Sequence, residues 1–216
     1  MSDYHISAFT KDGKIYCAHE TDAKEIMPVG DIKLKGVHNL ENVLVSCLVG
    51  TIVGVGARSI ADAVSNFTGL EHRFETVDTV EGVEYIDDSK GTTVDSTKRA
   101  LESCSGPVIL IAGGKDKSSD YSLVKAAVKE RAKHVVLIGE AAKAIRKALG
   151  DVVPVSDAKT MDEAVEASHK LAKNGWVVLL SPMCSSFDMY KNYKERGDAF
   201  REAVAKMKNS GHVIKA

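Results

Sequence analysis

The sequence has few of the residues that build disulfide frameworks or structural zinc sites. Its four cysteines are Cys17, Cys47, Cys104 and Cys184, and no two of them have a C-x-x-C spacing. Zinc sites usually show such closely spaced pairs, and secreted disulfide scaffolds are much richer in cysteine. The sequence therefore argues against both classes and predicts free thiols in a cytoplasmic protein.

An excess of charge of one sign is also missing. The chain has 29 Lys and Arg, 30 Asp and Glu, a formal net charge of -1, and only 6% aromatic residues. Domains that bind nucleic acid usually carry basic clusters and stacking aromatics, and anionic membranes attract basic segments. We therefore expect neither nucleic acid nor a membrane as a partner.

No apolar run is long enough to span a membrane. The longest, residues 43–57, falls short of the ~20 residues that a span requires. The opening residues MSDYHISAFTKDGK are too polar for a signal peptide. With 44% hydrophobic and 27% charged residues, the composition is typical of a soluble globular protein.

The beginning of the chain predicts short strands without a helix of their own. Residues 5–9 and 14–18 flank Asp12-Gly13, which suits a tight hairpin turn, and residues 31–35 predict another strand. Helices are expected at residues 39–53 and 60–67, the second capped by Ser59. We interpret residues 1–35 as an incomplete piece of one domain and residues 36–216 as a second domain.

The rest of the chain alternates between strands and helices. Residues 72–80 and 83–87 predict an antiparallel hairpin. Short, continuously apolar strands between amphipathic helices indicate a parallel sheet that is covered on both faces. The expected fold class is therefore α/β, a Rossmann-like, mostly parallel sheet with helices on both faces and one antiparallel hairpin. Its further strands are expected at residues 107–113, 134–139, 152–155 and 176–181, and its helices at 122–132, 140–149, 161–172 and 188–208.

Three polar segments follow predicted strands, at the edge where ligands of open α/β sheets bind. They are residues 87–93, 113–120 and 181–188. A polar loop with a helix cap explains any one of them alone. Three at one edge favour a bound anion, because strand-to-helix junctions offer free N–H groups and two of the segments carry lysines.

The common phosphate-binding glycine patterns are absent from the sequence. No G-x-x-x-x-G-K-[ST] string occurs, and Gly50, Gly54 and Gly56 lie in an apolar helical run. A complete nucleotide-hydrolysing site is therefore not encoded here. Arg73 could clamp a phosphate or be a solvated arginine, and Asn42 could contact a purine or belong to a helix cap.

A series of short motifs runs in a fixed order from residue 36 to residue 200. They are Gly36-x-His38-Asn39-x-x-Asn42, Phe67-Thr68-Gly69-Leu70-x-His72-Arg73-Phe74-Glu75, Asp88-Ser89-Lys90-x-Thr92, Gly113-Gly114-x-x-Lys117, Leu180-Ser181-Pro182-x-x-Ser185-Ser186-x-Asp188 and Arg196-Gly197-x-x-Phe200. As a set they resemble the C-terminal part of the Mur ligase family, over about residues 30–216. Within the family they are most similar to the ligases that add D-glutamate to UDP-N-acetylmuramoyl-L-alanine in peptidoglycan synthesis.

The resemblance implies a role for individual residues. The implied D-glutamate set is Thr92, Lys117, Ser186, Phe187 through its backbone N–H, and Tyr193. The implied ATP set is Asn42, Arg73 and Asp88, and Lys90 is implied as the catalytic residue beside the reacting phosphates and carboxylates. Arg196 and Gly197 stay open between packing in the last helix and contact with substrate.

Three positions depart from the family's pattern. Thr93 stands where an Asn is frequent, and Lys115 where an acidic or aromatic residue is expected. Lys115 could change the affinity or the choice of amino acid. Gly91 is expected to loosen the loop before Thr92.

The resemblance also implies what this chain works with. Family members have three domains, so the UDP-binding domain and most of the central ATPase domain would lie outside this chain, with residues 1–35 as closing strands of the central one. The implied cofactors are ATP and Mg²⁺, whose protein ligands lie mainly in the central domain. We expect a monomer that needs the missing domains as partners and is inactive alone.

Two other interpretations stay open. The chain could belong to another ligase of the superfamily, such as a folylpolyglutamate synthase or the ligase that adds the third peptide residue. The latter commonly carries an Asp-Asn-Pro-Arg string, which does not occur here. Alternatively, the chain could be a non-catalytic module that binds an amino acid or a nucleotide.

Overall fold

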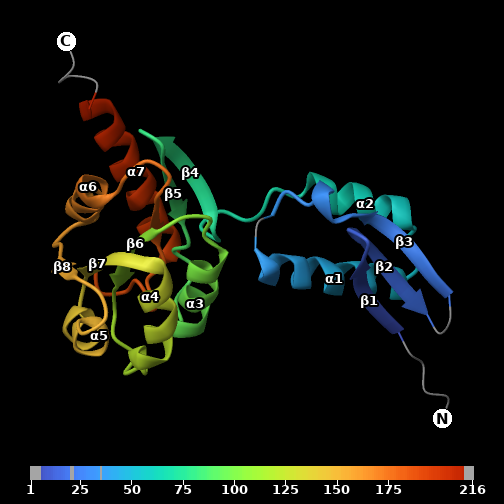
Figure 1. Ribbon diagram of the computed structural model, residues 1–216, viewed down its shortest axis with the longest axis horizontal. Coiled ribbons are helices and arrows are strands. Elements are labelled where there is room, and N and C mark those ends of the chain that lie inside the picture. The colour runs from blue at the N-terminus through green and yellow to red at the C-terminus, as the bar shows by residue number, and fades with distance from the viewer. Residues whose placement is uncertain (1–5, 20–21, 35, 212–216) are drawn as a thin grey trace. The chain divides into compact units, whose positions relative to one another are not determined.

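The computed structural model describes residues 6–19, 22–34 and 36–211, without the side chains of His19 and His38. The predicted strand residues His5 and Lys35 and the side chain of the motif residue His38 therefore lie outside the described part. The chain divides into two compact units, Met1–Gly69 and Leu70–Ala216. Figure 1 shows the first unit from blue to cyan and the second from green to red.

The first unit is a three-stranded antiparallel sheet with two helices. It contains β1 (Ile6–Lys11), β2 (Lys14–His19), β3 (Asp22–Pro28), the short 3-10 helix η1 (Val29–Asp31), α1 (Val37–Ile52) and α2 (Ala57–Asn66). Ile15 and Met27 from the strands, Val43 and Cys47 from α1, and Ile60 from α2 share one buried cluster. The first compact unit ends at Gly69, because both helices pack with the early strands. The boundary between family domains expected near residue 35 stays a prediction.

Some predictions for the first unit are confirmed and others are wrong. The hairpin turn at Asp12-Gly13 is confirmed, with positive φ angles of 49° and 73°. The strand expected at residues 31–35 is wrong, since the third strand is Asp22–Pro28. The Ser59 cap is also wrong, because α2 begins at Ala57 and its N-cap Gly56 has no side-chain cap.

The second unit contains a six-stranded sheet in the order β4-β5-β9-β6-β7-β8. β4 runs antiparallel to β5, and the remaining neighbours are parallel. The predicted fold class is confirmed. The strands are β4 (Glu75–Val80), β5 (Val83–Asp87), β6 (Val108–Gly113), β7 (Ala132–Ile138), β8 (Val155–Asp157) and β9 (Val177–Leu180).

Helices cover both faces of this sheet (Figure 1). Leu110 of β6 belongs to a buried cluster with the helices α3, α4 and α5, whereas its neighbour Ile111 belongs to a second cluster with α6 and α7. Successive side chains of a strand point to opposite faces, so an apolar run fills both layers. The helices are α3 (Val94–Ser103), α4 (Lys125–Arg131) with the preceding 3-10 turn η2 (Tyr121–Val124), α5 (Ala142–Leu149), α6 (Met161–Leu171) and α7 (Tyr193–Gly211).

Three features of the second unit differ from the sequence prediction. Helix α3 was not expected, β8 lies at residues 155–157 instead of 152–155, and α7 begins at Tyr193 instead of residue 188. The segment before α7 is an irregular loop that begins after Leu180. In the described ranges of the chain, no helix combines the length and the apolar character needed to cross a membrane.

Candidate functional site

Three loops begin side by side at the carboxyl edge of the large sheet. They follow β5, β9 and β6, which are adjacent and parallel strands. We name them the β5 loop (residues 88–93), the β9 loop (residues 181–192) and the β6 loop (residues 114–120). The sequence predicts three polar segments at one edge, and the strand order adds that the β9 loop starts between the other two.

Backbone hydrogen bonds join the β9 loop to its neighbours. Met183 N donates to Gly91 O at 3.0 Å, and Lys115 N donates to Ser185 O at 2.9 Å. Gly113, the last residue of β6, also donates from its N–H to Pro182 O at 2.9 Å. These bonds fix the spacing of the loops, so side chains from all three are held over one edge.

The five residues predicted to bind D-glutamate lie on these loops and on the first turn of α7. Lys117 Nζ is 3.4 Å from Thr92 O, which brings the β6 and β5 loops together. Ser186 is buried in the β9 loop, and its carbonyl accepts hydrogen bonds from Met189 N and Tyr190 N. The structure therefore brings Lys117 to Thr92 and puts the other members on the neighbouring β9 loop and at the start of α7. The binding role of the set stays a prediction. The two remaining members are Phe187, a residue that is 71% exposed, and Tyr193, which is the first residue of α7.

Lys90 is held against the first turn of α7. Its ammonium nitrogen lies 4.4 Å from the centre of the Tyr193 ring, within the range of a cation–π contact. Its backbone N–H donates to His72 O at 2.9 Å, and the Ser89 hydroxyl donates to Tyr193 O at 2.7 Å. The predicted catalytic lysine and the predicted aromatic contact are thus direct neighbours.

The predicted ATP residues are divided between the two units. Asn42 lies on α1 in the first unit, where its carbonyl accepts from Ser46 Oγ at 2.8 Å. Arg73 and Asp88 lie in the second unit. Arg73 is exposed in the turn before β4, between His72 and Phe74, which both have positive φ angles. Arg73 and Asp88 therefore share a unit, and the charge of Arg73 acts on the Asp88 carboxyl group.

Asp88 has an unusual electrostatic environment. Its Oδ2 accepts a hydrogen bond from Ser181 Oγ at 2.8 Å, and Ser181 Oγ also lies 2.8 Å from Thr97 Oγ1. Burial raises the pKa of Asp88 to about 7, against the opposing effects of the Ser181 hydroxyl and the Phe74 N–H. The neighbouring charge of Asp87 adds to the rise, and the charge of Arg73 reduces it.

A buried pair of side chains without a role predicted from the sequence, and a buried arginine whose role the sequence left open, lie beside the loops. His72 Nδ1 and Asp87 Oδ2 are 2.7 Å apart, and both side chains are fully enclosed. Arg196 is 1% exposed, although it is a charged residue in the last helix. A signal for Arg196 was present, because it shares the apolar face of α7 with Phe200 and Val204.

One set of side chains in the described ranges has ligand atoms close enough to hold a metal. His72, Glu75 and Asp87 place these atoms within 4.8 Å of one another. However, His72 and Asp87 already bond to each other, and Glu75 pairs with Arg201. Mg²⁺ prefers an octahedral shell of oxygens, which this set does not offer. The three residues therefore belong to one hydrogen-bonded network, and we assign no metal to them.

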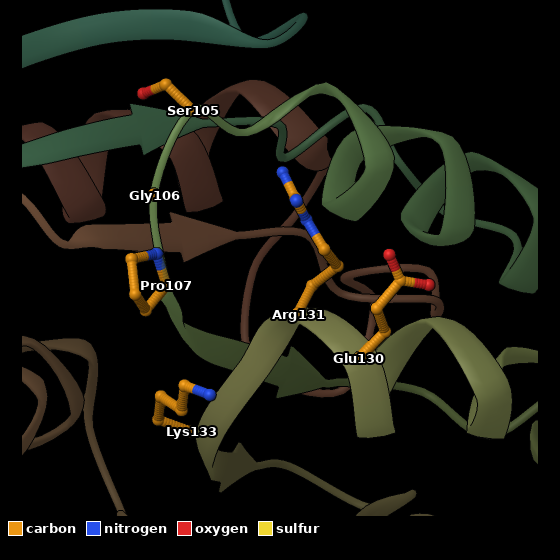
Figure 2. Close-up of a pocket in the computed structure, with 6 residues that line it drawn as sticks. All are labelled: Ser105, Gly106, Pro107, Glu130, Arg131 and Lys133. Atoms are coloured by element: carbon orange, nitrogen blue, oxygen red, sulfur yellow. The ribbon is translucent and has the colours of Figure 1, made fainter.

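A cavity of about 190 Å³ lies away from this edge, where β6 and β7 begin. Figure 2 shows the turn at residues 105–107 on one side of it and Arg131 and Lys133 on the other. Arg131 donates hydrogen bonds to the carbonyls of Leu101 and Cys104. It therefore supplies partners for carbonyl groups that the C-terminal end of α3 leaves without helical N–H donors. None of the residues predicted from the motifs lines this cavity. Its lining is Ser105, Gly106, Pro107, Glu130, Arg131 and Lys133.

Residues 72–184 match the family model described as Mur ligase, glutamate ligase domain. The UDP-N-acetylmuramoylalanine--D-glutamate ligase of Koribacter versatilis is 47% identical over 199 residues, which are 92% of this chain and 44% of that protein. The ligase of the same name from Geobacter sp. is 44% identical over 194 residues, 90% of this chain and 43% of that protein. This chain thus spans less than half the length of these relatives.

Solved structures show the same fold at low sequence identity. A UDP-N-acetylmuramate-alanine ligase from Thermotoga maritima aligns with a TM-score of 0.62 and 16% identity, covering 94% of this chain and 45% of that one. A folylpolyglutamate synthase from Mycobacterium tuberculosis, complexed with ADP and AMPPCP, gives a TM-score of 0.62 and 13% identity, covering 95% and 48%. Both likenesses concern the fold.

Proposed function

The chain belongs to the Mur ligase family, and from this premise we propose that it is part of an ATP-dependent ligase that adds D-glutamate to UDP-N-acetylmuramoyl-L-alanine in peptidoglycan synthesis. Relatives with that name share 47% and 44% of the aligned residues. The observation that carries the proposal is the convergence of the three loops, with Lys117 placed beside Thr92.

The proposed task of the second unit is to orient D-glutamate. Lys117 supplies a positive charge for a carboxylate, while Thr92, Ser186 and the N–H of Phe187 supply neutral hydrogen-bond donors. Charge-assisted bonds of this kind are short and directional, so they can hold a dicarboxylate at both ends. The amine then remains free to react, and Tyr193 packs against the amino acid.

The proposed reaction has two steps. The L-alanine carboxylate of the UDP-linked substrate attacks the γ-phosphorus of ATP, which gives an acyl phosphate and releases ADP. The D-glutamate amine, after losing a proton, attacks the acyl carbon, and the tetrahedral intermediate expels phosphate and leaves an amide. Lys90 neutralises charge beside the reacting groups, since such reactions depend mainly on positioning and electrostatics.

The nucleotide is the ligand that Arg73 and Asp88 are proposed to contact. Arg73 offers an exposed guanidinium, which suits phosphate oxygens. Asp88 offers a carboxyl group whose pKa of about 7 lets it either accept or donate a hydrogen bond near neutral pH. Mg²⁺ would be held mainly by residues outside this chain, because the acidic cluster near His72 does not suit it.

The first unit is proposed to be a remaining piece of the central ATPase domain. Residues 1–35 are the predicted closing strands, and within them β2 and β3 form one core with α1 and α2. Asn42 on α1 would contact the nucleotide. Val45 and Val49 on α1 are 60% and 53% exposed, which is unusual for a helix in a complete domain. We therefore infer that the rest of the central domain covers this side of α1.

The remaining parts of the proposal concern the state of the chain. The isolated chain is proposed to be a monomer without ligase activity, because the P-loop string does not occur in its sequence. The cytoplasm is the proposed location, since ATP and the UDP-linked substrate are available there. Activity would then require a polypeptide with the UDP-binding and central domains.

Titration of the isolated chain with D-glutamate tests the binding site directly. We expect Lys117→Ala to weaken D-glutamate binding by about tenfold or more, since a hydrogen bond to a charged group is worth about 1.5–3 kcal/mol. Chemical shifts of the backbone amides report the binding. Lys133→Ala, an exposed lysine near the start of β7, is the matched control and should bind like the unchanged chain.

Equal binding by Lys117→Ala and the unchanged chain would contradict the site. Competition with L-glutamate and with a diamino acid separates the proposed ligase from other members of the superfamily. The whole reaction is tested by adding the missing domains and measuring ADP release that depends on D-glutamate. Release without a preference for D-glutamate would point to a different substrate.

A further inference from the structure

Arg196 is the largest side chain that is fully enclosed in the described part of the molecule. A buried guanidinium is unfavourable unless its donors are satisfied. Its Nε donates to Ser89 Oγ at 3.0 Å, and its Nη2 donates to Ser89 O at 2.9 Å and to Cys184 O at 3.1 Å. The side chain therefore cross-links the β5 loop to the β9 loop.

The β6 loop lies against the same guanidinium. A Cβ added to Gly114 would lie 3.0 Å from Arg196 Nη1 and 2.4 Å from Ser185 O. Gly114 also has a φ of +135°, a backbone conformation that residues with a side chain rarely adopt. The close approach of the β6 loop to Arg196 thus depends on a glycine at this position.

We propose that Arg196 is a positioning residue that holds the three site loops in register for D-glutamate. The inference rests on the proposed function, because the residues it positions are those of the proposed site. Ser89 precedes Lys90, Cys184 lies two residues before Ser186, and Gly114 lies three residues before Lys117. The planar guanidinium of arginine has five N–H donors in a fixed arrangement, so it can set the spacing of the loops, whereas the single ammonium of a lysine cannot.

Asp188 does not explain why Arg196 is buried. Asp188 Oδ2 accepts from Glu140 N at 2.9 Å, and its Oδ1 has no hydrogen-bond partner among the described residues. Arg196 Nη1 is likewise without one in that part of the chain. The two groups attract each other electrostatically, but the hydrogen bonds of Arg196 go to Ser89 and Cys184. Its position is therefore set by the loops.

The first test measures the loops without ligand. In the isolated chain, Arg196→Lys keeps the positive charge and removes the guanidinium with its fixed hydrogen-bond donors. We expect amide hydrogen exchange in the β5, β6 and β9 loops to rise about tenfold, while β6 and β7 stay protected. Lys194→Met, a change at an exposed residue on the same helix, should leave exchange unchanged.

The second test measures D-glutamate binding. We expect Arg196→Lys to weaken binding about tenfold, with unfolding still cooperative. Gly114→Ala should give the same loss by a different route, since its Cβ displaces the guanidinium and Ser185. Lys194→Met should bind D-glutamate like the unchanged chain.

Specific outcomes overturn the inference. Unchanged loop exchange in Arg196→Lys would show that Arg196 does not hold the loops. An equal rise in exchange over the whole sheet would show a role in global stability alone. Absence of D-glutamate binding by the unchanged chain would refute the proposed function and the D-glutamate part of this inference, while the exchange result still decides whether Arg196 orders the loops.

Discussion

Asp88 shows how its surroundings change the behaviour of a single side chain. Its carboxyl group is enclosed by the loops, and its pKa rises from the ordinary 3.8 to about 7. The folded chain therefore holds a proton that the unfolded chain releases between about pH 4 and pH 7. The stability that this proton contributes is complete below that window and is lost as the pH rises through it.

Asp88→Asn is expected to remove this loss. Relative to the unchanged chain, the variant should gain stability on the order of 2 kcal/mol between pH 4.5 and pH 8, since one pKa unit corresponds to about 1.4 kcal/mol. The Asn side-chain oxygen can still accept the bond from Ser181. Denaturant unfolding at several pH values measures the difference.

The control for this experiment is Asp95→Asn, at an exposed carboxylate that pairs with Arg99. Its effect should be small, because exposed ion pairs contribute little. A difference between Asp88→Asn and the unchanged chain that stays constant with pH would contradict the raised pKa of Asp88.

The sequence predicted the positions of some single residues, but it did not predict how tightly others pack. Lys117 and Thr92 could be placed at the sheet edge because each follows an apolar strand. The expectation that Gly91 loosens its loop stays a prediction, and the structure gives another reason for the glycine, since an added Cβ would lie 2.2 Å from Asp88 Oδ2. That packing joins residues 88 and 91 to Ser181, which is distant in sequence, so no local pattern could reveal it.

The starts of α3 and α7 show which capping patterns are present in the sequence. Thr93 caps α3 through a hydrogen bond from Ser96 N, but the helix has few apolar positions and was not predicted. For α7, Asn192 Oδ1 accepts from Lys194 N and Glu195 N, and Glu195 Oε2 accepts from Lys191 N. This reciprocal cap fixes the start at Tyr193, and an Asn followed three residues later by Glu was visible in the sequence.

Removing this cap is expected to weaken the first turn of α7. Asn192→Ala should lower the free energy of unfolding by about 1 kcal/mol, because two backbone N–H groups lose their partner. Asn192→Asp keeps the accepting oxygen and should be close to the unchanged chain. Thermal unfolding of the three proteins measures the effect, and an equal loss in both variants would exclude capping as the cause.

The whole molecule is two units, and this division was only partly predictable. Continuous apolar strands indicated the parallel sheet of the second unit, whereas its strand order depends on long-range pairing, such as β9 between β5 and β6. The first unit looked incomplete because its early strands had no helix of their own. Their partners, α1 and α2, follow residue 35, so the compact boundary could not be read from local composition.

Helix α1 gives a test of how the first unit is completed. Val43 and Cys47 face the core of the unit, whereas Val45 and Val49 are exposed and four residues apart, on one stripe of the helix. We expect the isolated chain to bind a hydrophobic dye through this stripe.

Val45→Lys with Val49→Lys should reduce the dye signal strongly and leave the unfolding midpoint nearly unchanged, because exposed positions tolerate charge. The matched control is Val43→Lys, which buries a charge in the core and should unfold the first unit. The central domain, added as a separate polypeptide, should bind the unchanged chain and fail to bind the double variant. Unchanged dye binding, or capture of the double variant by the central domain, would show that this stripe is not the surface that the rest of the domain covers.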